Sequence, residues 1–360
     1  MTDPERRLAP VVRVAPAKLN LTLAVVGRRD DGFHALHSVV VPLGLADRLS
    51  LAVRAGGSST VDSTRAGASA DAGDSLHVTG FDPGPAGDNL VLRAIVATRA
   101  AVARTWPGAP AQPPALAARL DKRIPVTAGL GGGSSDAAAA IDAALEAWGA
   151  TATDEERVRI AVSIGSDVPL FLAGGPALIE GRGERVTRLH GVRCPPGEEP
   201  GVLLVTPALA VHTADVFAAW SSGAMAEPGI ARRTSEHFAS EFGSGLTGRQ
   251  LLERAAVLAS ANDLAAAAAV VAPPLIPFRR ALTRLLGRPV GLSGSGPTLW
   301  VLYPSLVAAE EAAAAVRSAV ERGELEAPGA GPPFVAATPI AAGQPDDLLP
   351  GEESSRRVQG

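Results

Sequence analysis

A glycine-rich loop that runs directly into an alanine-rich stretch constrains this chain most. The segment Pro125–Ser135 is PVTAGLGGGSS, and four consecutive alanines follow one residue later. Glycine lets a backbone adopt positive φ and approach an anion closely, and alanine is the strongest helix former. The N–H groups of such a loop and the positive end of the helix dipole bind phosphate together. We therefore predict a phosphate site rather than a flexible linker, with Ser134, Ser135 and Asp136 as possible N-cap oxygens.

The cation for this phosphate site must come from outside the loop. No GK[ST] follows the glycines, and Ser134 stands where a dinucleotide fingerprint needs its third glycine. Of the 33 basic residues only Lys18 and Lys122 are lysine, which leaves 31 arginines. Asparagine is also scarce, with Asn20, Asn89 and Asn262 alone. The composition is thus biased against lysine and asparagine. The few that remain are candidates for roles that need an amine or an amide, although for any one of them its presence by chance is an equal alternative.

Lys18 and Asp167 are charged residues that lie beside apolar runs. Lys18 lies in APAKLNL, where we predict a tight turn at 16–18 between strands at 11–15 and 19–26. A lysine buried among apolar residues needs a carboxylate or phosphate partner. Asp167 in GSDVP precedes an apolar run and is as compatible with an ordinary turn as with that partnership. Lys122, in DKRIPV, is also compatible with a solvated strand end.

Two further segments carry weaker signals. Phe33 and His34 follow a turn (DDGFH) and could stack on and hydrogen-bond a nucleobase, but packing at the start of a strand explains them better. The turn SGSGP at 293–297 is compatible with a hairpin or with a second phosphate contact.

Composition excludes several classes of protein. The 360 residues are 46% hydrophobic and 19% charged, which argues against disorder and for about two domains. The net charge of −4 and pI near 5.9 give no general basic footprint for nucleic acid. Cys194 is the only cysteine, and no apolar stretch of membrane-spanning length is present. We expect a cytoplasmic protein that binds small molecules, with no nucleic acid and no membrane.

The pattern of segments predicts an α+β protein. We expect separate strands at 37–43 and 47–53, a strand or turn at 168–173, and a loop-rich segment at 221–246. Residues 55–74 are small and polar and predict a flexible loop, and 193–201 is the best linker candidate. The second half alternates strands and helices as an α+β sandwich does.

Three of these segments, in this order, resemble the motifs of the GHMP small-molecule kinases. They are APAKLNL at 15–21, PVTAGLGGGSS at 125–135 and LSGSGPT at 292–298. The resemblance covers roughly residues 11–340, and the middle motif is the specific one. It implies the two-domain GHMP kinase fold, with a ribosomal S5 domain 2-like N-terminal domain at 1–195, a ferredoxin-like C-terminal domain at 196–340 and a disordered tail at 341–360. It also implies an ATP-dependent kinase that uses Mg²⁺.

Within that family, the runs at 16–43 and 165–175 resemble the branch that phosphorylates the 2-hydroxyl of a methylerythritol carrying cytidine diphosphate, in the non-mevalonate isoprenoid pathway. By this resemblance Asp167 is the catalytic base and Lys18 the cation paired with it. Substrate contacts are implied for Asn20, Phe33, His34, Thr213 and Phe217. Contacts with ATP are implied for Asn89, Lys122, Gly129, Leu130, Gly131, Gly132, Gly133, Ser134 and Ser135.

The chain departs from the family pattern at two positions. Phe33 stands where tyrosine is common, so stacking is retained but a phenolic hydrogen bond is lost. Asp136 puts a charge next to the phosphate site, as an N-cap or a magnesium-facing group. The metal ligands are left unassigned, and we expect a monomer or a weak homodimer.

Overall fold

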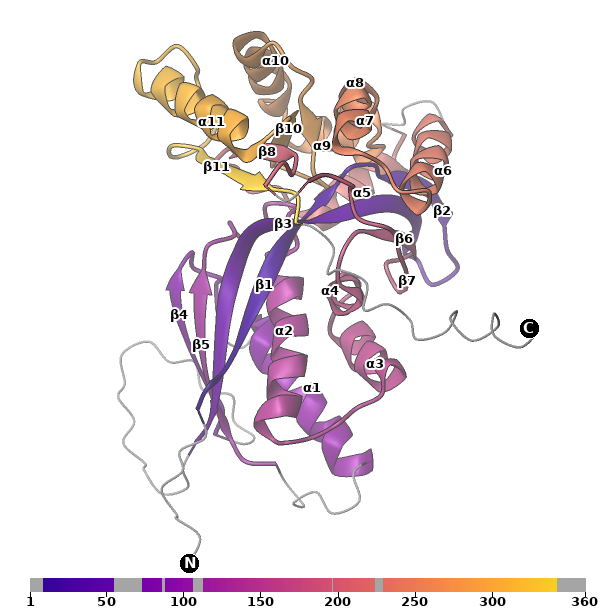
Figure 1. The fold of residues 1–360 in the computed structure, drawn as a ribbon, viewed down its shortest axis with the longest axis vertical. Helices are drawn as coiled ribbons and strands as arrows, with labels where there is room; N and C mark the ends of the chain where they lie inside the picture. Colours follow the sequence, from indigo (N-terminus) through magenta and orange to yellow (C-terminus); the bar gives the residue numbers. More distant parts are fainter. Residues whose placement is uncertain are drawn as a thin grey trace, which may run out of the picture.

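Two sheets organise the part of the chain that the computed structural model describes, which is residues 9–54, 73–85, 88–105, 113–195, 197–223 and 229–341. Figure 1 shows that the first sheet runs from one end of the molecule, where its own helices lie, up to the second sheet and its helices. Most of the predicted 55–74 loop, and the predicted tail beyond Ala341, lie outside the described residues.

The first sheet is built around one long central strand. Its strand order is β4-β5-β3-β6-β7, and β1 and β2 also pair with β3. Only the pairing of β4 with β5 is parallel. The strands are β1 (Val11–Asn20), β2 (Ala24–Arg28), β3 (His34–Val53), β4 (Ser75–Gly80), β5 (Leu116–Lys122), β6 (Ala177–Gly181) and β7 (Arg185–Arg188).

The prediction of two strands at 37–43 and 47–53 is wrong, because β3 continues through both. β3 changes partners along its length: it pairs with β6 at 36–40 and with β5 at 48–53. Between these stretches the N–H of Leu45 donates to Thr338 Oγ1 at 2.7 Å. A Cβ on Gly44 would lie 2.8 Å from the Pro339 ring. Gly44, which lies between the two predicted strands, lets a distant strand approach β3.

The prediction of a turn at 16–18 is also wrong, because β1 runs straight through it. The pairing of β1 with β3 shifts register between Pro16 and Lys18, as in a β-bulge. Proline has no N–H to donate to the ladder, and the strand absorbs this as a bulge rather than as a reversal. The N–H of Lys18 leaves the ladder and donates to the carbonyl of Leu130 at 2.9 Å. The bulge thereby places Lys18 beside the glycine-rich loop.

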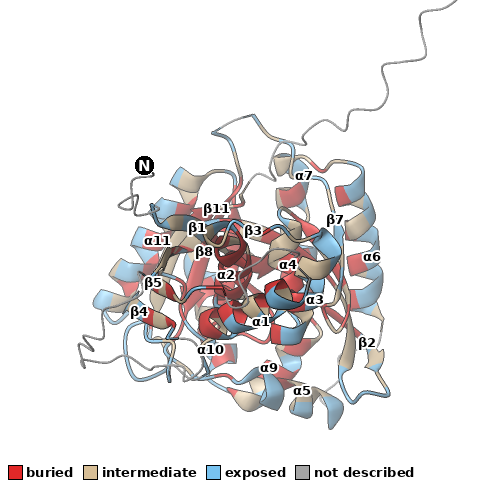
Figure 2. Cartoon of the chain, turned by 90° about the horizontal axis from the view of Figure 1, so that it is seen from below, coloured by how far each residue is buried: buried red, intermediate tan, exposed pale blue. Residues whose placement is uncertain are grey.

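Helices cover the first sheet on one side (Figure 1). They are α1 (Leu90–Thr105), α2 (Gly132–Ala147), α3 (Asp154–Ile164) and α4 (Val168–Ala173). Helix α2 is buried along most of its length (Figure 2), since its alanines allow close packing against the sheet. The prediction of a strand or turn at 168–173 is wrong: Pro169 lies in the first turn of α4, where proline favours a helix start.

The second sheet is antiparallel, in the order β11-β8-β10-β9. Its strands are β8 (Gly201–Thr206), β9 (Gly291–Leu292), β10 (Leu299–Tyr303) and β11 (Phe334–Pro339). The helices of this half are α5 (Thr213–Ser221), α6 (Ile230–Gly243), α7 (Gly248–Glu253), α8 (Ala255–Ser260), α9 (Leu264–Val271), α10 (Leu275–Leu286) and α11 (Leu306–Glu321).

Helix α6 corrects the prediction of a loop-rich segment at 221–246. Its buried positions are Ala231, Ser235, Phe238 and Phe242, which fall on one face at helical spacing. A serine in that narrow stripe, and polar residues on every other side, hide the period in the sequence.

One hydrophobic core joins the two sheets. It contains Leu19 and Val41 from the first sheet, Leu204 and Trp300 from the second, and Phe242 from α6. The division at 195/196 stays a prediction, and the two halves share apolar packing across it. In the described part of the chain no single helix is long and apolar enough to cross a membrane; α9 and α10 reach that length only as a pair bent by 117°.

The fit of Trp300 predicts a strong effect of a single methyl group. Gly291 pairs with Trp300 across β9 and β10, and a Cβ there would lie 2.2 Å from the indole. We expect Gly291→Ala to lower the free energy of unfolding by roughly 1–3 kcal/mol, as overpacked cores do. Urea unfolding measures this. Gly331→Ala, where a Cβ would meet nothing within 4 Å, is the control and is expected to change little. Equal stability of both variants would contradict the packing argument.

Candidate active site

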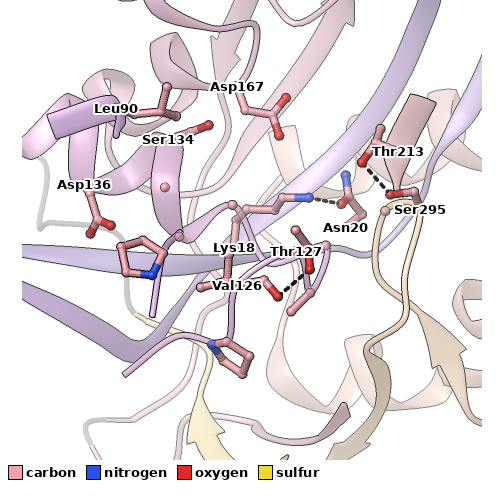
Figure 3. A pocket seen from close by; sticks show the side chains of 18 of the residues that line it. Lys18, Asn20, Leu90, Val126, Thr127, Ser134, Asp136, Asp167, Thr213 and Ser295 are labelled. Atoms are coloured by element: carbon pink, nitrogen blue, oxygen red, sulfur yellow. Dashed lines mark hydrogen bonds between the residues drawn. The ribbon is translucent and has the colours of Figure 1, made fainter. Parts of the chain in front are cut away.

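The predicted functional segments converge on one cavity of about 380 Å³ (Figure 3). It lies where the glycine-rich loop, the β1 bulge and the start of α4 meet the second half of the chain. The predicted site residues that line it are Lys18, Asn20, Asn89, Lys122, Gly129, Gly131, Gly132, Gly133, Ser134, Asp167, Thr213 and Phe217. The predicted residues that do not line it are Phe33, His34, Leu130 and Ser135.

The glycine-rich loop adopts a conformation that only glycine tolerates. Gly129 and Gly131 have φ of 75° and 70°, and Gly131 is the N-cap of α2 without any side-chain cap. The predicted N-cap role of Ser134, Ser135 and Asp136 is therefore wrong. A Cβ on Gly131 would lie 2.8 Å from the Phe171 ring and 2.9 Å from Lys18 Cγ. The first N–H groups of α2 thus remain available at the cavity wall.

The turn at 293–297, in the second half of the chain, packs against this loop. Ser293 Oγ donates to the carbonyl of Gly129 at 3.0 Å, and a Cβ on Gly129 would lie 2.4 Å from the Ser293 carbonyl oxygen. Asn262 braces the same turn, since its Nδ2 donates to the carbonyls of Leu292 and Gly294, each at 2.9 Å. The sequence marked Asn262 by its rarity but assigned it no role; in the structure it positions the turn.

Lys18 is buried at the centre of the site. Its side chain is 6% exposed, and its ammonium donates to Asn20 Oδ1 at 2.5 Å (Figure 3). Burial lowers the Lys18 pKa below its ordinary value, and the Asp167 carboxylate acts in the opposite direction. The hydrogen-bond partner of this lysine is therefore an amide, while the predicted carboxylate partner acts through its charge.

Asp167 sits at the N-terminus of α4 with its carboxylate uncommitted. It is the N-cap residue by position, yet its side chain makes no cap hydrogen bond. No ion pair or hydrogen bond joins the Asp167 carboxylate to another described residue. Figure 3 shows the carboxylate directed toward the same space as Lys18 and Ser134. A half-buried acid beside a buried ammonium, with a free oxygen facing a cavity, is suited to accept a proton from a bound ligand.

Lys122 is held between two carboxylates, so a solvated strand end does not describe it. Its ammonium is ion-paired with Asp47 and, at 2.7 Å, with Asp136, and all three side chains are buried. Asp47 also accepts from the N–H groups of Arg123 and Ile124, which fixes the exit from β5. Burial raises the pKa of Asp136 to about 7; Lys122 opposes this rise and Asp47 adds to it. Sequence reasoning missed Asp47, whose only signal is an acid in a buried strand.

Three other residues of the predicted ATP site differ in how they face the cavity. Asn89 Oδ1 accepts from the N–H of Val91 at 2.9 Å, so its oxygen caps α1. The side chains of Leu130 and Ser135 are 1% exposed and lie in the protein interior. The Ser135 hydroxyl has no hydrogen-bond partner among the described residues. Leu130 and Ser135 can contribute to this site only through their backbone.

Aromatic side chains gather around Phe217, the one of them that lines the cavity; this group, with Phe33 and His34, is the aromatic end of the site. His34 stacks on Phe217 with ring centroids 5.0 Å apart, and its Nε2 lies 2.9 Å from Ser221 Oγ. Burial, and then the charge of Arg28, lower the His34 pKa, which favours a neutral ring that can both donate and accept. Phe33 is 54% exposed and carries the Arg182 guanidinium 5.3 Å from its ring centre. Thr213 Oγ1 lies 2.9 Å from Ser295 Oγ in the cavity wall.

The family comparisons match both halves of the chain. The GHMP kinases N terminal domain model matches residues 89–175, and the GHMP kinases C terminal model matches residues 245–322. The chain is 35% identical over 320 residues to the 4-diphosphocytidyl-2-C-methyl-D-erythritol kinase of Pelotomaculum thermopropionicum, covering 87% of this chain and 96% of that protein. It is 37% identical to the enzyme of the same name from Methylobacterium radiotolerans, covering 85% and 93%.

Solved structures agree with these matches. A crystal structure of 4-(cytidine 5'-diphospho)-2C-methyl-D-erythritol kinase superposes with a TM-score of 0.61 at 30% identity, over 91% of this chain and 99% of that one. The mevalonate kinase of Methanococcus jannaschii reaches a TM-score of 0.62 at 12% identity, over 93% and 100%, and shares the fold alone. This chain belongs to the GHMP kinases, a family of ATP-dependent small-molecule kinases with mixed α and β structure. Within the family, its relatives at 35–37% identity carry the name 4-diphosphocytidyl-2-C-methyl-D-erythritol kinase.

The raised pKa of Asp136 predicts a pH-dependent stability. The folded protein binds this proton up to about pH 7, whereas an unfolded aspartate releases it near its ordinary pKa of 3.8. The resulting stabilisation is present at acid pH and lost as the pH rises through about 7. From pH 5 to pH 7 we expect the wild type to lose roughly 1–2 kcal/mol relative to Asp136→Asn, measured by urea unfolding. The exposed Asp121→Asn is the control. Parallel curves for wild type and Asp136→Asn would refute the shift.

Proposed function

We propose that this protein transfers the γ-phosphoryl group of ATP to the 2-hydroxyl of 4-diphosphocytidyl-2-C-methyl-D-erythritol, in the non-mevalonate route to isoprenoid precursors. The curated relatives that cover most of the chain carry the name of this kinase. The observation that carries the proposal is that Lys18, Asp167 and the glycine-rich loop face one cavity at the junction of the two halves.

In the reaction we propose, Asp167 is the general base. The substrate hydroxyl oxygen attacks the γ-phosphorus, the bond to the bridging oxygen of ADP breaks, and the hydroxyl proton passes to the Asp167 carboxylate. The free carboxylate oxygens of Asp167 support this role, because a base already committed to an ion pair would be a poorer acceptor. Phosphoryl transfer otherwise depends on positioning and on charge stabilisation.

Lys18 and the loop supply that stabilisation. The Lys18 ammonium would lie beside the transferring group, where its low-dielectric surroundings strengthen its effect on developing negative charge. The N–H groups at the start of α2 would hold the triphosphate, with Asn89 near the nucleoside. Lys122 is different: with two carboxylates around it, it would fix the base of the loop and present little net positive charge to the phosphates.

Mg²⁺ is part of the proposal as the partner of ATP. No described cluster of three or more His, Cys, Asp and Glu residues is arranged to hold a metal ion. The donor set therefore fits Mg²⁺ that is bound mainly by phosphate oxygens and water, and the Ser134 hydroxyl of the loop also lines the cavity. When bound, the ion would neutralise charge on the phosphates.

The aromatic end of the cavity would take the cytidine. Phe33 and Phe217 are the side chains that would flank the base, and the neutral His34 would hydrogen-bond it. Asn20 and Thr213, from opposite halves of the chain, would contact the methylerythritol part. A monomer or weak homodimer in the cytoplasm, with small molecules rather than nucleic acid or membrane as partners, completes the proposal.

Turnover by the wild-type protein tests the proposed function directly. Phosphorus NMR follows Mg-ATP with 4-diphosphocytidyl-2-C-methyl-D-erythritol, and with homoserine and mevalonate as parallel controls. We expect a new phosphomonoester signal, with ADP in equal amount, only in the cytidyl sample. Phosphorylation of a control compound instead would discard the assignment of the aromatic end.

Asp167→Asn tests the base. Because the amide cannot accept the hydroxyl proton, we expect kcat to fall by roughly 10²–10⁴-fold, with the protein folded and ATP still bound. ADP release measures turnover, and thermal unfolding with fluorescent nucleotide binding provides the controls for folding. Asp154→Asn, at a side chain that is 94% exposed, should leave kcat unchanged. Turnover of Asp167→Asn near the wild-type rate would remove Asp167 from this role.

A further inference from the structure

A row of buried hydrogen bonds leads from Lys18 into the protein. The ammonium donates to Asn20 Oδ1 at 2.5 Å, and Asn20 Nδ2 donates to Ser38 Oγ at 2.8 Å. The Ser38 hydroxyl then donates to the carbonyl of Thr22 at 2.5 Å. These four residues are each at most 6% exposed, and Lys18, Asn20 and Ser38 also line the cavity.

The order of donors and acceptors in this row is fixed. An ammonium can only donate, so Asn20 must turn its oxygen toward Lys18 and its nitrogen away. The Ser38 hydroxyl has one hydrogen, which the Thr22 carbonyl takes, so its oxygen is left to accept from Asn20 Nδ2. A flipped amide would set an NH₂ group against the ammonium at one end. Ser38 is thus the group that selects the amide orientation that Lys18 needs.

The far end of the row is anchored on the second half of the chain. Thr22 Oγ1 accepts from the N–H of Val39 at 3.0 Å and lies 2.8 Å from Ser235 Oγ in α6. Ser235 is fully buried, and its oxygen is also 2.8 Å from His37 Nδ1. These bonds fix Thr22, whose carbonyl receives the Ser38 hydrogen.

Burying the Ser38 hydroxyl costs free energy that an apolar side chain would not cost. An apolar side chain at position 38 would fill the same volume without burying a hydroxyl. The Lys18 ammonium has no hydrogen bond to a described residue other than the one to Asn20, so the amide oxygen is what holds this desolvated charge in place. Without this bond the ammonium would have no fixed partner among the described side chains.

We propose that Ser38 is a positioning residue for phosphoryl transfer: by holding the Asn20 amide with its oxygen toward Lys18, it keeps the Lys18 ammonium directed into the cavity. The proposal rests on the proposed function. It predicts a loss of rate that is separate from substrate affinity, because Ser38 acts through Asn20 and Lys18.

Steady-state kinetics of Ser38→Ala test this positioning role. We expect kcat to fall by roughly tenfold, the size of one lost hydrogen bond, with both KM values within about twofold of wild type. Ser38→Thr keeps the hydroxyl on a strand residue and should restore most of kcat. A raised KM for the cytidyl substrate at unchanged kcat would mean that Ser38 contacts substrate, which overturns the proposal.

Two controls separate positioning from stability and from the proposed function. Thr98→Val removes a fully buried hydroxyl in α1, bonded to the carbonyl of Ala94 at 2.8 Å, and should lower stability while leaving kcat intact. If Ser38→Ala does not fold, Ser38→Cys decides, because a thiol is too weak a partner to hold the amide. A wild-type kcat in Ser38→Ala or in Ser38→Cys overturns the inference alone, whereas a wild-type protein without turnover overturns the proposed function.

Discussion

Burial of the Lys18 ammonium without an ion pair is the constraint on which the site depends. A desolvated charge must be held by oriented dipoles, and these come from the Asn20 amide and the Ser38 hydroxyl behind it. The aliphatic part of Lys18 passes so close to Gly131 that no side chain fits there. The bulge at Pro16 and Lys18 frees the Lys18 N–H to bond Leu130. The loop that presents backbone N–H groups is thus shaped around the lysine.

Lys18 and Lys122, the two lysines near the loop, have different kinds of partner. Lys18 keeps an amide as its partner and leaves the Asp167 carboxylate free. Lys122 is enclosed by two carboxylates, one of which has an unpartnered oxygen. Paired charges stabilise local structure and have little left to offer a ligand, whereas an unpaired acid and a nearby ammonium retain their chemistry. This difference follows from which acids are within reach of each lysine, and the sequence alone does not contain it.

Much of the architecture was predictable from local signals. The glycine loop, the alanine-rich helix after it and the strands of the second sheet follow from residue types whose preferences are strong. The failures share a cause: tertiary contacts overrode the local signal. Pro16, where a turn was predicted, and Gly44, which separates two predicted strands, both lie within continuous strands. Helix α6 hides its buried stripe behind a serine. At the site, rarity pointed to the lysines and asparagines, but Asp47 and Ser38 carry ordinary residue types. Their importance comes from partners far away in the sequence.

The hydrogen bond between Ser293 and Gly129 has a consequence for biosynthesis. The loop, Lys18 and Asp167 all lie in the first half of the chain. Asn262 and Ser293, which hold the loop from the second half, follow Gly129 by 133 and 164 positions. A ribosome-bound chain of 200 residues therefore contains every group that would act on phosphate but lacks the contacts that hold the loop in shape. Such late long-range closure is slow to form. The contact between Ser293 and Gly129 can form only after residue 293 has been synthesised.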